Sequence, residues 1–183
     1  VTVVIIHSGD GSWTTDMLNN FDDGTVQGWA AVTETFATTL LEVDTAFVLS
    51  APYSLRMSHY TSIGCPLEVR SRLYKSVTTP NRNNVYAIFD LRCRALIVGG
   101  ESTRIKYVNI KRDGTLLIYL GRPYDAVVAS YFPTDKWFRV VTPLPPNTTL
   151  ELRVILDALQ CTFITTDFRS YIYMDDFKII SKD

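Results

Sequence analysis

Short stretches in which apolar and polar residues alternate recur along almost the whole chain. Alternation with a period of two is typical of β-strands that bury one face and expose the other. Thr, Val, Ile, Tyr and Phe, which favour strands, are abundant, and the 3.6-residue helical period is nearly absent. The clearest predicted strands are Tyr53 to Tyr60, Leu67 to Val77, Asn84 to Ala95, Ile105 to Lys111, Thr115 to Leu120, Trp137 to Thr142, Leu150 to Leu156 and Tyr171 to Ile180.

Turn sequences separate these strands. Asp113-Gly114 stands between two apolar runs and predicts a hairpin, and Gly99-Gly100 marks another turn. Because strands do not alternate with helices, the pattern predicts an all-β fold, a two-sheet antiparallel β-sandwich. No composition shift divides the chain, so a single domain is expected over residues 1–183, with an N-terminal strand and loop at 1–19 and the sandwich body at 20–180. The loop is expected at residues 8–19.

The parity of two predicted strands indicates a core face and a polar face. In residues 85–95, alternate apolar side chains lie opposite Tyr86, Asp90, Arg92 and Arg94. In residues 67–74, Arg70, Arg72 and Tyr74 lie opposite the apolar positions in the same way. If these strands are neighbours, their four arginines form one basic patch. The alternative is a solvated sheet face with cross-strand ion pairs, each worth little.

Composition narrows the function classes. The chain has 183 residues, 46% hydrophobic and 20% charged, which suits one globular domain. A net charge of -1 argues against a general binder of nucleic acid or anionic membranes. The apolar runs are too short for membrane insertion as a helix. The sequence lacks the G-x-S-x-G, H-E-x-x-H and P-loop motifs, so an enzyme is not expected.

The cysteines and a glycosylation motif bear on location. Cys65, Cys93 and Cys161 are too few and too widely spaced for a zinc site or a disulfide framework. They are either buried apolar residues or include one bridged pair. Asn147-Thr148-Thr149 matches the N-glycosylation sequon, which is a hint of export.

Two acidic motifs stand near opposite ends of the chain. The first is Asn20-Phe21-Asp22-Asp23-Gly24, and the second is Tyr173-Met174-Asp175-Asp176-Phe177. Carboxylates beside a strand need water, hydrogen bonds or a cation. The residues alone leave two alternatives open: a Ca²⁺ site, or a solvated turn and a solvated strand end.

The order of the motifs resembles a known family. Across most of residues 18–180, the two acidic motifs occur together with Gly28-Trp29, Tyr53-Ser54-Leu55-Arg56 and Asp135-Lys136-Trp137. The set is similar to the galactose-binding-like carbohydrate-binding modules, which are β-sandwich jelly rolls stabilised by calcium. The resemblance implies a jelly-roll fold and a structural Ca²⁺, with Asp22, Asp175 and Asp176 as the candidate ligands. It also implies that Trp29 and Trp137 lie in the core.

The resemblance further implies non-catalytic binding of a polysaccharide or oligosaccharide by an extracellular or cell-surface protein. Modules of this family occur with or without an attached catalytic domain. Jelly-roll polysaccharide lyases share the architecture, but their strand signatures are not found here. The same scaffold also serves in structural domains. The alternative function is therefore a structural or adhesive domain of an extracellular assembly, without a sugar site.

A sugar site needs aromatic rings for the C–H faces of the sugar and charged or amide groups for its hydroxyls. Trp13 and Tyr124 are candidates because they stand in loop sequences, and loops often carry binding residues. The other candidates come from the polar strand faces. The full predicted set is Trp13, Tyr74, Tyr86, Arg70, Arg72, Arg92, Arg94 and Tyr124.

Overall fold

A computed structural model describes residues 12–35, 38–61, 69–96, 104–113, 115–121, 136–159 and 168–183. Within these ranges all regular secondary structure is strand, as the alternation predicts. The strands are β1 (Thr14–Asn19), β2 (Ala30–Thr35), β3 (Thr38–Asp44), β4 (Ser54–Thr61), β5 (Val69–Thr78), β6 (Asn84–Leu96), β7 (Arg104–Arg112), β8 (Thr115–Gly121), β9 (Trp137–Leu144), β10 (Thr149–Leu159) and β11 (Phe168–Lys182).

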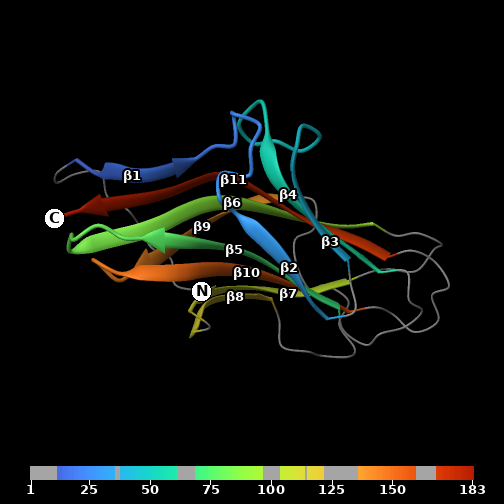
Figure 1. Cartoon of the computed structure of the whole chain (residues 1–183). Coiled ribbons are helices and arrows are strands. Elements are labelled where there is room, and N and C mark those ends of the chain that lie inside the picture. The colour runs from blue at the N-terminus through green and yellow to red at the C-terminus, as the bar shows by residue number, and fades with distance from the viewer. Residues whose placement is uncertain are drawn as a thin grey trace.

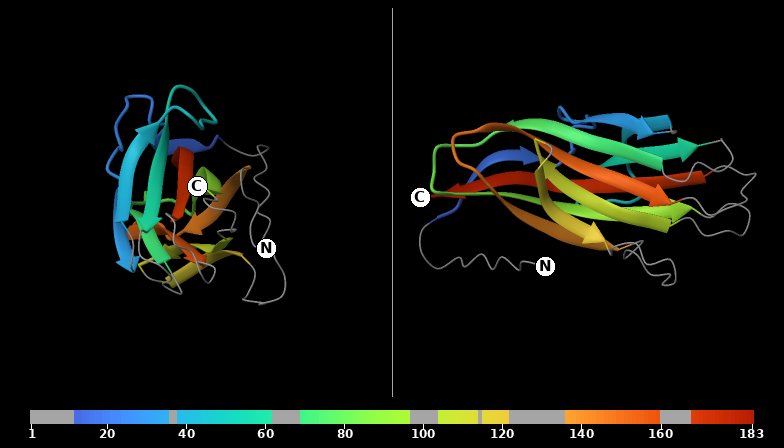
Figure 2. Two further views of the ribbon diagram at one scale, coloured as in Figure 1. Left: turned by 90° about the vertical axis from the view of Figure 1, so that its right-hand side faces the viewer. Right: turned by 90° about the horizontal axis from the view of Figure 1, so that it is seen from below.

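The strands form two antiparallel sheets that pack face to face (Figure 1; Figure 2). The first sheet has the order β3-β4-β11-β6-β9, and β1 also pairs with β11. The second sheet has the order β2-β5-β10-β7-β8. This arrangement confirms the predicted all-β sandwich. No helix in the described part of the chain is long and apolar enough to cross a membrane.

The core lies between the sheets and follows the predicted parity. On β6, Val85, Ala87, Phe89, Leu91 and Cys93 all face the core, and the core continues into the second sheet. Aromatic side chains lie at its centre. Phe177 meets Trp29 edge to face at 5.1 Å between ring centroids and Phe89 at 5.8 Å. Each such buried side chain contributes about 1.5–3 kcal/mol by leaving water.

Residues 14–19 correct the expectation of a loop over residues 8–19. They form β1, which pairs with the C-terminal half of β11, from Thr14 opposite Ser181 to Asn19 opposite Phe177. The sequence of this segment is mostly polar, which fits a strand that buries little of its surface. Even Leu18 is 54% exposed. Its strand conformation comes from backbone pairing with β11, which local alternation does not encode. The initial strand expected before it lies outside the described residues.

Trp137 is a second correction. The resemblance implies a core position, but Trp137 is half-buried and pairs with Arg92 on the outer side of β9. Its neighbour Phe138 packs against the core, and Val140 is buried in it. Both residues at the start of β9 are large and aromatic, so hydrophobicity alone does not decide which one points inward. Trp29, in contrast, is buried in the core as expected.

Strand β11 contains a bulge at the second acidic motif. Ile172 and Met174 face the core before it, and Phe177 and Ile179 face the core after it. The pairing register between β11 and β6 shifts between Asp175 and Lys178, and Asp176 has a φ of 49°. A single extra residue of this kind reverses the parity of a strand. Asp175 can therefore lie on the outer side while the apolar residues on either side of the bulge remain in the core.

Candidate functional site

The four arginines predicted as one patch belong to two different sheets. Arg70 and Arg72 are on β5 in the second sheet, whereas Arg92 and Arg94 are on β6 in the first. The single basic patch is therefore not formed. The condition that the two strands be neighbours fails because the chain crosses from one sheet to the other between β5 and β6.

The outer side of the first sheet instead gathers Arg, acidic and aromatic residues from five strands. Cross-strand pairing aligns one row: Glu42 pairs with Arg56, Arg56 with Tyr173, Tyr173 with Arg92, and Arg92 with Trp137. Tyr171 and Arg94 pair beside this row. We call the following set the Arg–aromatic face: Glu42, Asp44, Phe47, Arg56, Arg92, Arg94, Trp137, Tyr171 and Tyr173.

The aromatic rings of this face are in contact with one another. Tyr171 and Tyr173 stack at 6.2 Å between centroids with an interplanar angle of 26°. Phe47, from the loop between β3 and β4, meets the Tyr173 ring edge to face at 5.2 Å. Tyr173 is only 2% exposed, whereas Phe47, Tyr171 and Trp137 are half-buried. The last three therefore present ring surface to solvent.

Guanidinium groups surround these rings. The Cζ atoms of Arg92 and Arg94 lie 4.2 Å and 4.8 Å from the centroid of the Phe47 ring, and that of Arg56 lies 5.9 Å from the Tyr171 ring. These distances are in the range of cation–π attraction. The contacts hold the long arginine side chains in place, which lowers the entropy cost of using their N–H groups as donors.

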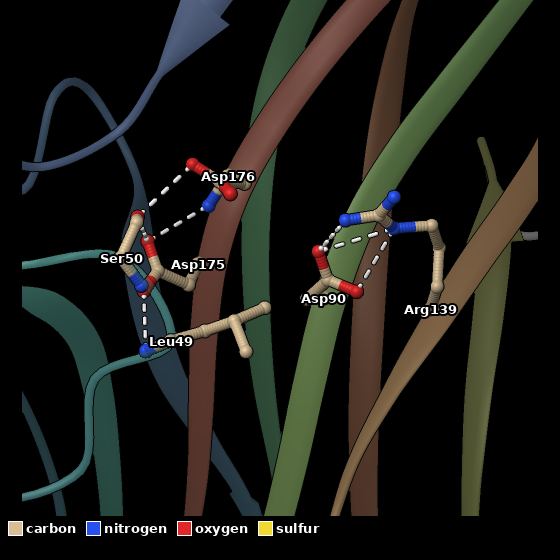
Figure 3. Close-up of polar contacts among 6 residues, drawn as sticks. All are labelled: Leu49, Ser50, Asp90, Arg139, Asp175 and Asp176. Atoms are coloured by element: carbon tan, nitrogen blue, oxygen red, sulfur yellow. Dashed lines mark hydrogen bonds and ion pairs between the residues drawn. The ribbon is translucent and has the colours of Figure 1, made fainter.

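Carboxylates of the same sheet orient two of its arginines. Arg56 bonds to Glu42, with Nε donating to Oε1 at 3.0 Å, and also forms an ion pair with Asp44. Arg139 donates to both oxygens of the buried Asp90, at 2.7 Å from its terminal nitrogen to Oδ2 (Figure 3). Hydrogen bonding to Asp90 raises the pKa of Arg139. Burial raises the pKa of Tyr173, so its hydroxyl remains protonated at neutral pH.

The remaining predicted sugar-binding residues lie elsewhere. Trp13 and Tyr86 contact each other edge to face at 5.7 Å; Tyr86 is on the first sheet, about 20 Å along β6 from Arg92. Arg72 lies over the Tyr74 ring at 5.2 Å on the second sheet. Arg92 and Arg94 are thus the predicted residues that the fold brings to the Arg–aromatic face. Tyr124 lies outside the described residues, as do Cys65 and Cys161, and Cys93 is a buried free thiol.

The first acidic motif forms an exposed turn. The Gly24 amide donates to the Phe21 carbonyl at 2.9 Å, and the Phe21 side chain anchors the turn in the core. Asp22 is exposed and accepts a hydrogen bond from Asn20. Asp23 accepts from the Thr25 amide at 2.9 Å, and this hydrogen bond lowers its pKa. The turn thus satisfies its own carboxylates locally.

The second acidic motif is buried and hydrogen-bonded to a loop. Asp175 is 0% exposed; its Oδ2 accepts from the Leu49 and Ser50 amides, both at 2.9 Å (Figure 3). Its Oδ1 accepts from the Asp176 amide at 2.9 Å and lies 3.0 Å from the Ser50 hydroxyl. That hydroxyl also lies 3.1 Å from Oδ1 of Asp176.

The predicted ligands do not come together as a metal site. Among the described residues, no group of three or more His, Cys, Asp or Glu side chains is arranged to hold a metal ion. Ca²⁺ takes six to eight oxygen ligands, whereas both oxygens of Asp175 already accept hydrogen bonds. As they lie here, these side chains do not fit the ion, and the calcium site implied by the resemblance is an expectation that is still untested.

A buried ammonium group lies where the first motif meets the sandwich. Lys75 is on the core side of β5 and 9% exposed, and its Nζ donates to Oδ1 of Asn19 at 2.8 Å and to the Gln27 carbonyl. Asn19 ends β1, which belongs to the other sheet. Burial lowers the pKa of Lys75. This side chain therefore connects the two sheets and the loop between β1 and β2.

Sequence reasoning missed seven members of the Arg–aromatic face: Glu42, Asp44, Phe47, Arg56, Trp137, Tyr171 and Tyr173. A signal was available for the last two. Because Ile172 and Met174 are apolar, alternation places Tyr171 and Tyr173 on the opposite, outer side of their strand. Phe47 had no such signal, since it belongs to a loop.

Comparisons with known proteins support the fold. No protein-family model matches the sequence, and no curated protein matches it. Among solved structures, the xylan-binding CBM22-1 domain of Paenibacillus barcinonensis Xyn10C is 16% identical with a TM-score of 0.56, and the match covers 96% of this chain and 99% of that one. A structure of carbohydrate-binding modules from the β-sandwich superfamily is 17% identical with a TM-score of 0.56; the match covers 87% of this chain and 60% of that one.

Two further structures each have a TM-score of 0.54. The mannan-recognising module TmCBM27 is 11% identical, and the match covers 94% of this chain and 100% of that one, with a TM-score of 0.54. An adhesin domain of Lys-gingipain from Porphyromonas gingivalis is 13% identical, and the match covers 92% of this chain and 100% of that one, also with a TM-score of 0.54. The chain therefore has the β-sandwich fold found in carbohydrate-binding modules.

Proposed function

We propose that this protein binds a polysaccharide or oligosaccharide without catalysis, and that the Arg–aromatic face is the binding surface. The observation that carries the proposal is the row across the first sheet, in which aromatic rings alternate with guanidinium groups and Tyr171 stacks on Tyr173 beside the row. Aromatic rings can stack on the C–H faces of sugars, and the fixed arginine donors can bond to their hydroxyls.

The neighbours in fold agree with this chemistry. The CBM22-1 domain is described as xylan-binding and TmCBM27 as a mannan-recognising module. We infer an extracellular or surface location from the same comparison and from the sequon at Asn147, which is exposed in the turn between β9 and β10. A catalytic domain attached in the same protein is compatible with such a module.

The test is native affinity electrophoresis against soluble xylan, mannan and an acidic polysaccharide. We expect one polymer to retard the protein, and Tyr171→Ala or Trp137→Ala to weaken that retardation about tenfold, the loss of roughly 1.4 kcal/mol of stacking. Tyr74→Ala and Arg72→Ala are the matched controls, because these residues form a similar Arg–aromatic pair on the opposite sheet. Neither control should change the retardation.

The alternative is a structural or adhesive domain with the same fold, which the similarity to the gingipain adhesin domain favours. If folded protein is retarded by no polymer, the binding proposal fails and this alternative is preferred. If the controls on β5 weaken retardation while the variants on the first sheet do not, a binding site exists but lies on the wrong sheet for this proposal.

A further inference from the structure

The loop between β3 and β4 determines which aromatic surface the Arg–aromatic face presents. Phe47 lies in this loop and contacts the Tyr173 ring edge to face, and Tyr173 is almost completely buried. The guanidinium groups of Arg92 and Arg94 lie over the Phe47 ring. The ring available to a ligand at this point therefore depends on where the loop lies.

The loop is attached to the sheet by the second acidic motif. Leu49 and Ser50, which closely follow Phe47 in the sequence, donate their backbone amides to Oδ2 of Asp175. Figure 3 shows the Asp175 carboxylate directed at these residues, across from the ion pair between Asp90 and Arg139. Another loop contact, in which the Ser54 hydroxyl donates to the Phe47 carbonyl at 2.7 Å, fixes the backbone at the aromatic residue itself.

A carboxylate is specifically required at this position. Both oxygens of Asp175 act as acceptors, Oδ2 for two loop amides and Oδ1 for the Asp176 amide. An asparagine side chain of the same shape has one acceptor oxygen and an NH₂ group that only donates. Whichever way the amide is turned, it faces at least one backbone N–H with another donor. Because the site is fully buried, water cannot replace the lost bond.

We propose that Asp175 is a positioning residue of the Arg–aromatic face: its carboxylate holds the β3–β4 loop so that Phe47 contacts Tyr173 and lies under the guanidinium groups of Arg92 and Arg94. The inference rests on the proposed function for its consequence in binding. It assigns to Asp175 the task of organising the ligand surface.

The first test measures the loop without any ligand. Hydrogen–deuterium exchange of Asp175→Asn should be at least tenfold faster than wild type at the amides of Leu49 and Ser50. The matched control is Asp90→Asn, the same substitution at the residue paired with Asp175 on β6, and it should leave exchange in this loop unchanged. Melting temperatures establish that each variant is folded. Ser50→Ala, which removes only hydroxyl contacts, is a milder second variant and should accelerate exchange less.

The second test measures binding with a double-mutant cycle. If Asp175 acts through Phe47, Asp175→Asn and Phe47→Ala each weaken the retardation by the bound polymer, and the double variant binds no more weakly than Phe47→Ala alone. Additive losses, or a loss in Phe47→Ala with none in Asp175→Asn, would overturn the inference. If wild-type protein binds no polymer, the proposed function fails, and exchange alone decides whether Asp175 positions the loop: unchanged exchange in both Asp175→Asn and Ser50→Ala would reject it.

Discussion

Asp90 on β6 and Asp175 on β11 are paired directly opposite each other, and different donors hold the two carboxylates. Like charges at paired positions in a sheet destabilise it unless each is compensated. Arg139 from β9 compensates Asp90 with an ion pair, whereas backbone amides of a loop and of Asp176 compensate Asp175 (Figure 3). The centre of the first sheet is therefore a place where two buried acids depend on separate partners.

Removing the partner of Asp90 should destabilise the protein. Arg139→Ala leaves a buried carboxylate without its guanidinium, and we expect the free energy of unfolding to fall by about 1–3 kcal/mol. Chemical denaturation measures the change. The double variant Asp90→Asn with Arg139→Ala should lose less than Arg139→Ala alone, because an unpaired buried charge is no longer present. An equal or larger loss in the double variant would contradict this explanation.

Asp175 should give the stability a specific pH dependence. Burial is the largest cause that raises its pKa above the ordinary value of 3.8, although its hydrogen bonds oppose the shift. The folded protein then holds this proton more tightly than the unfolded chain. The part of the stability that comes from this tighter proton binding is complete below the unfolded pKa and is lost as the pH rises through the folded one.

The measurement is chemical denaturation of wild type and Asp175→Asn across mildly acidic pH. The asparagine variant has no titrating group at this position, so the stability difference in favour of wild type should become smaller as the pH rises from about 4 through the raised pKa. A difference that instead grows with pH would show that the hydrogen bonds outweigh burial.

Lys75 should support the junction of the two sheets. Lys75→Met replaces the apolar stem of the side chain with one of similar size but leaves Oδ1 of Asn19 and the Gln27 carbonyl without their ammonium donor. We expect the free energy of unfolding to fall by about 1–3 kcal/mol, measured by chemical denaturation. Lys178→Met, on the outer side of β11, is the control and should change stability by less than about 0.5 kcal/mol. Equal effects of the two substitutions would speak against a special role of Lys75.

Calcium should have little influence on stability in the described part of the fold. Asp22 lies in an exposed turn, and the carboxylate of Asp175 already accepts hydrogen bonds from the loop amides. We therefore expect the melting temperature with millimolar Ca²⁺ to match that with chelator. Differential scanning calorimetry makes the comparison. A clear rise in melting temperature with calcium, absent with magnesium, would instead support the ligand set expected from the sequence.

Alternation and turn residues were sufficient to predict the sandwich. Each strand of a sandwich faces the opposite sheet with every second side chain, and these side chains must be apolar. That requirement is local, so β4 to β11 and the core face of β6 could be read from the sequence. The parity change between Met174 and Phe177 even contained the signal of the bulge in β11. Strand β1 escaped prediction because its conformation depends on pairing with β11 rather than on burial of its own side chains.

The candidate site depended on tertiary structure, because residues become a surface only when strands distant in sequence become neighbours. Sequence parity placed Arg72 and Arg92 on outer faces, but only the strand order put them on opposite sheets. The same order aligned Arg56, Tyr173 and Arg92 in one row. The sequence by itself thus determined which side chains face outward. The pairing of strands and the course of one loop decided which of them meet, since neither is encoded in local periodicity.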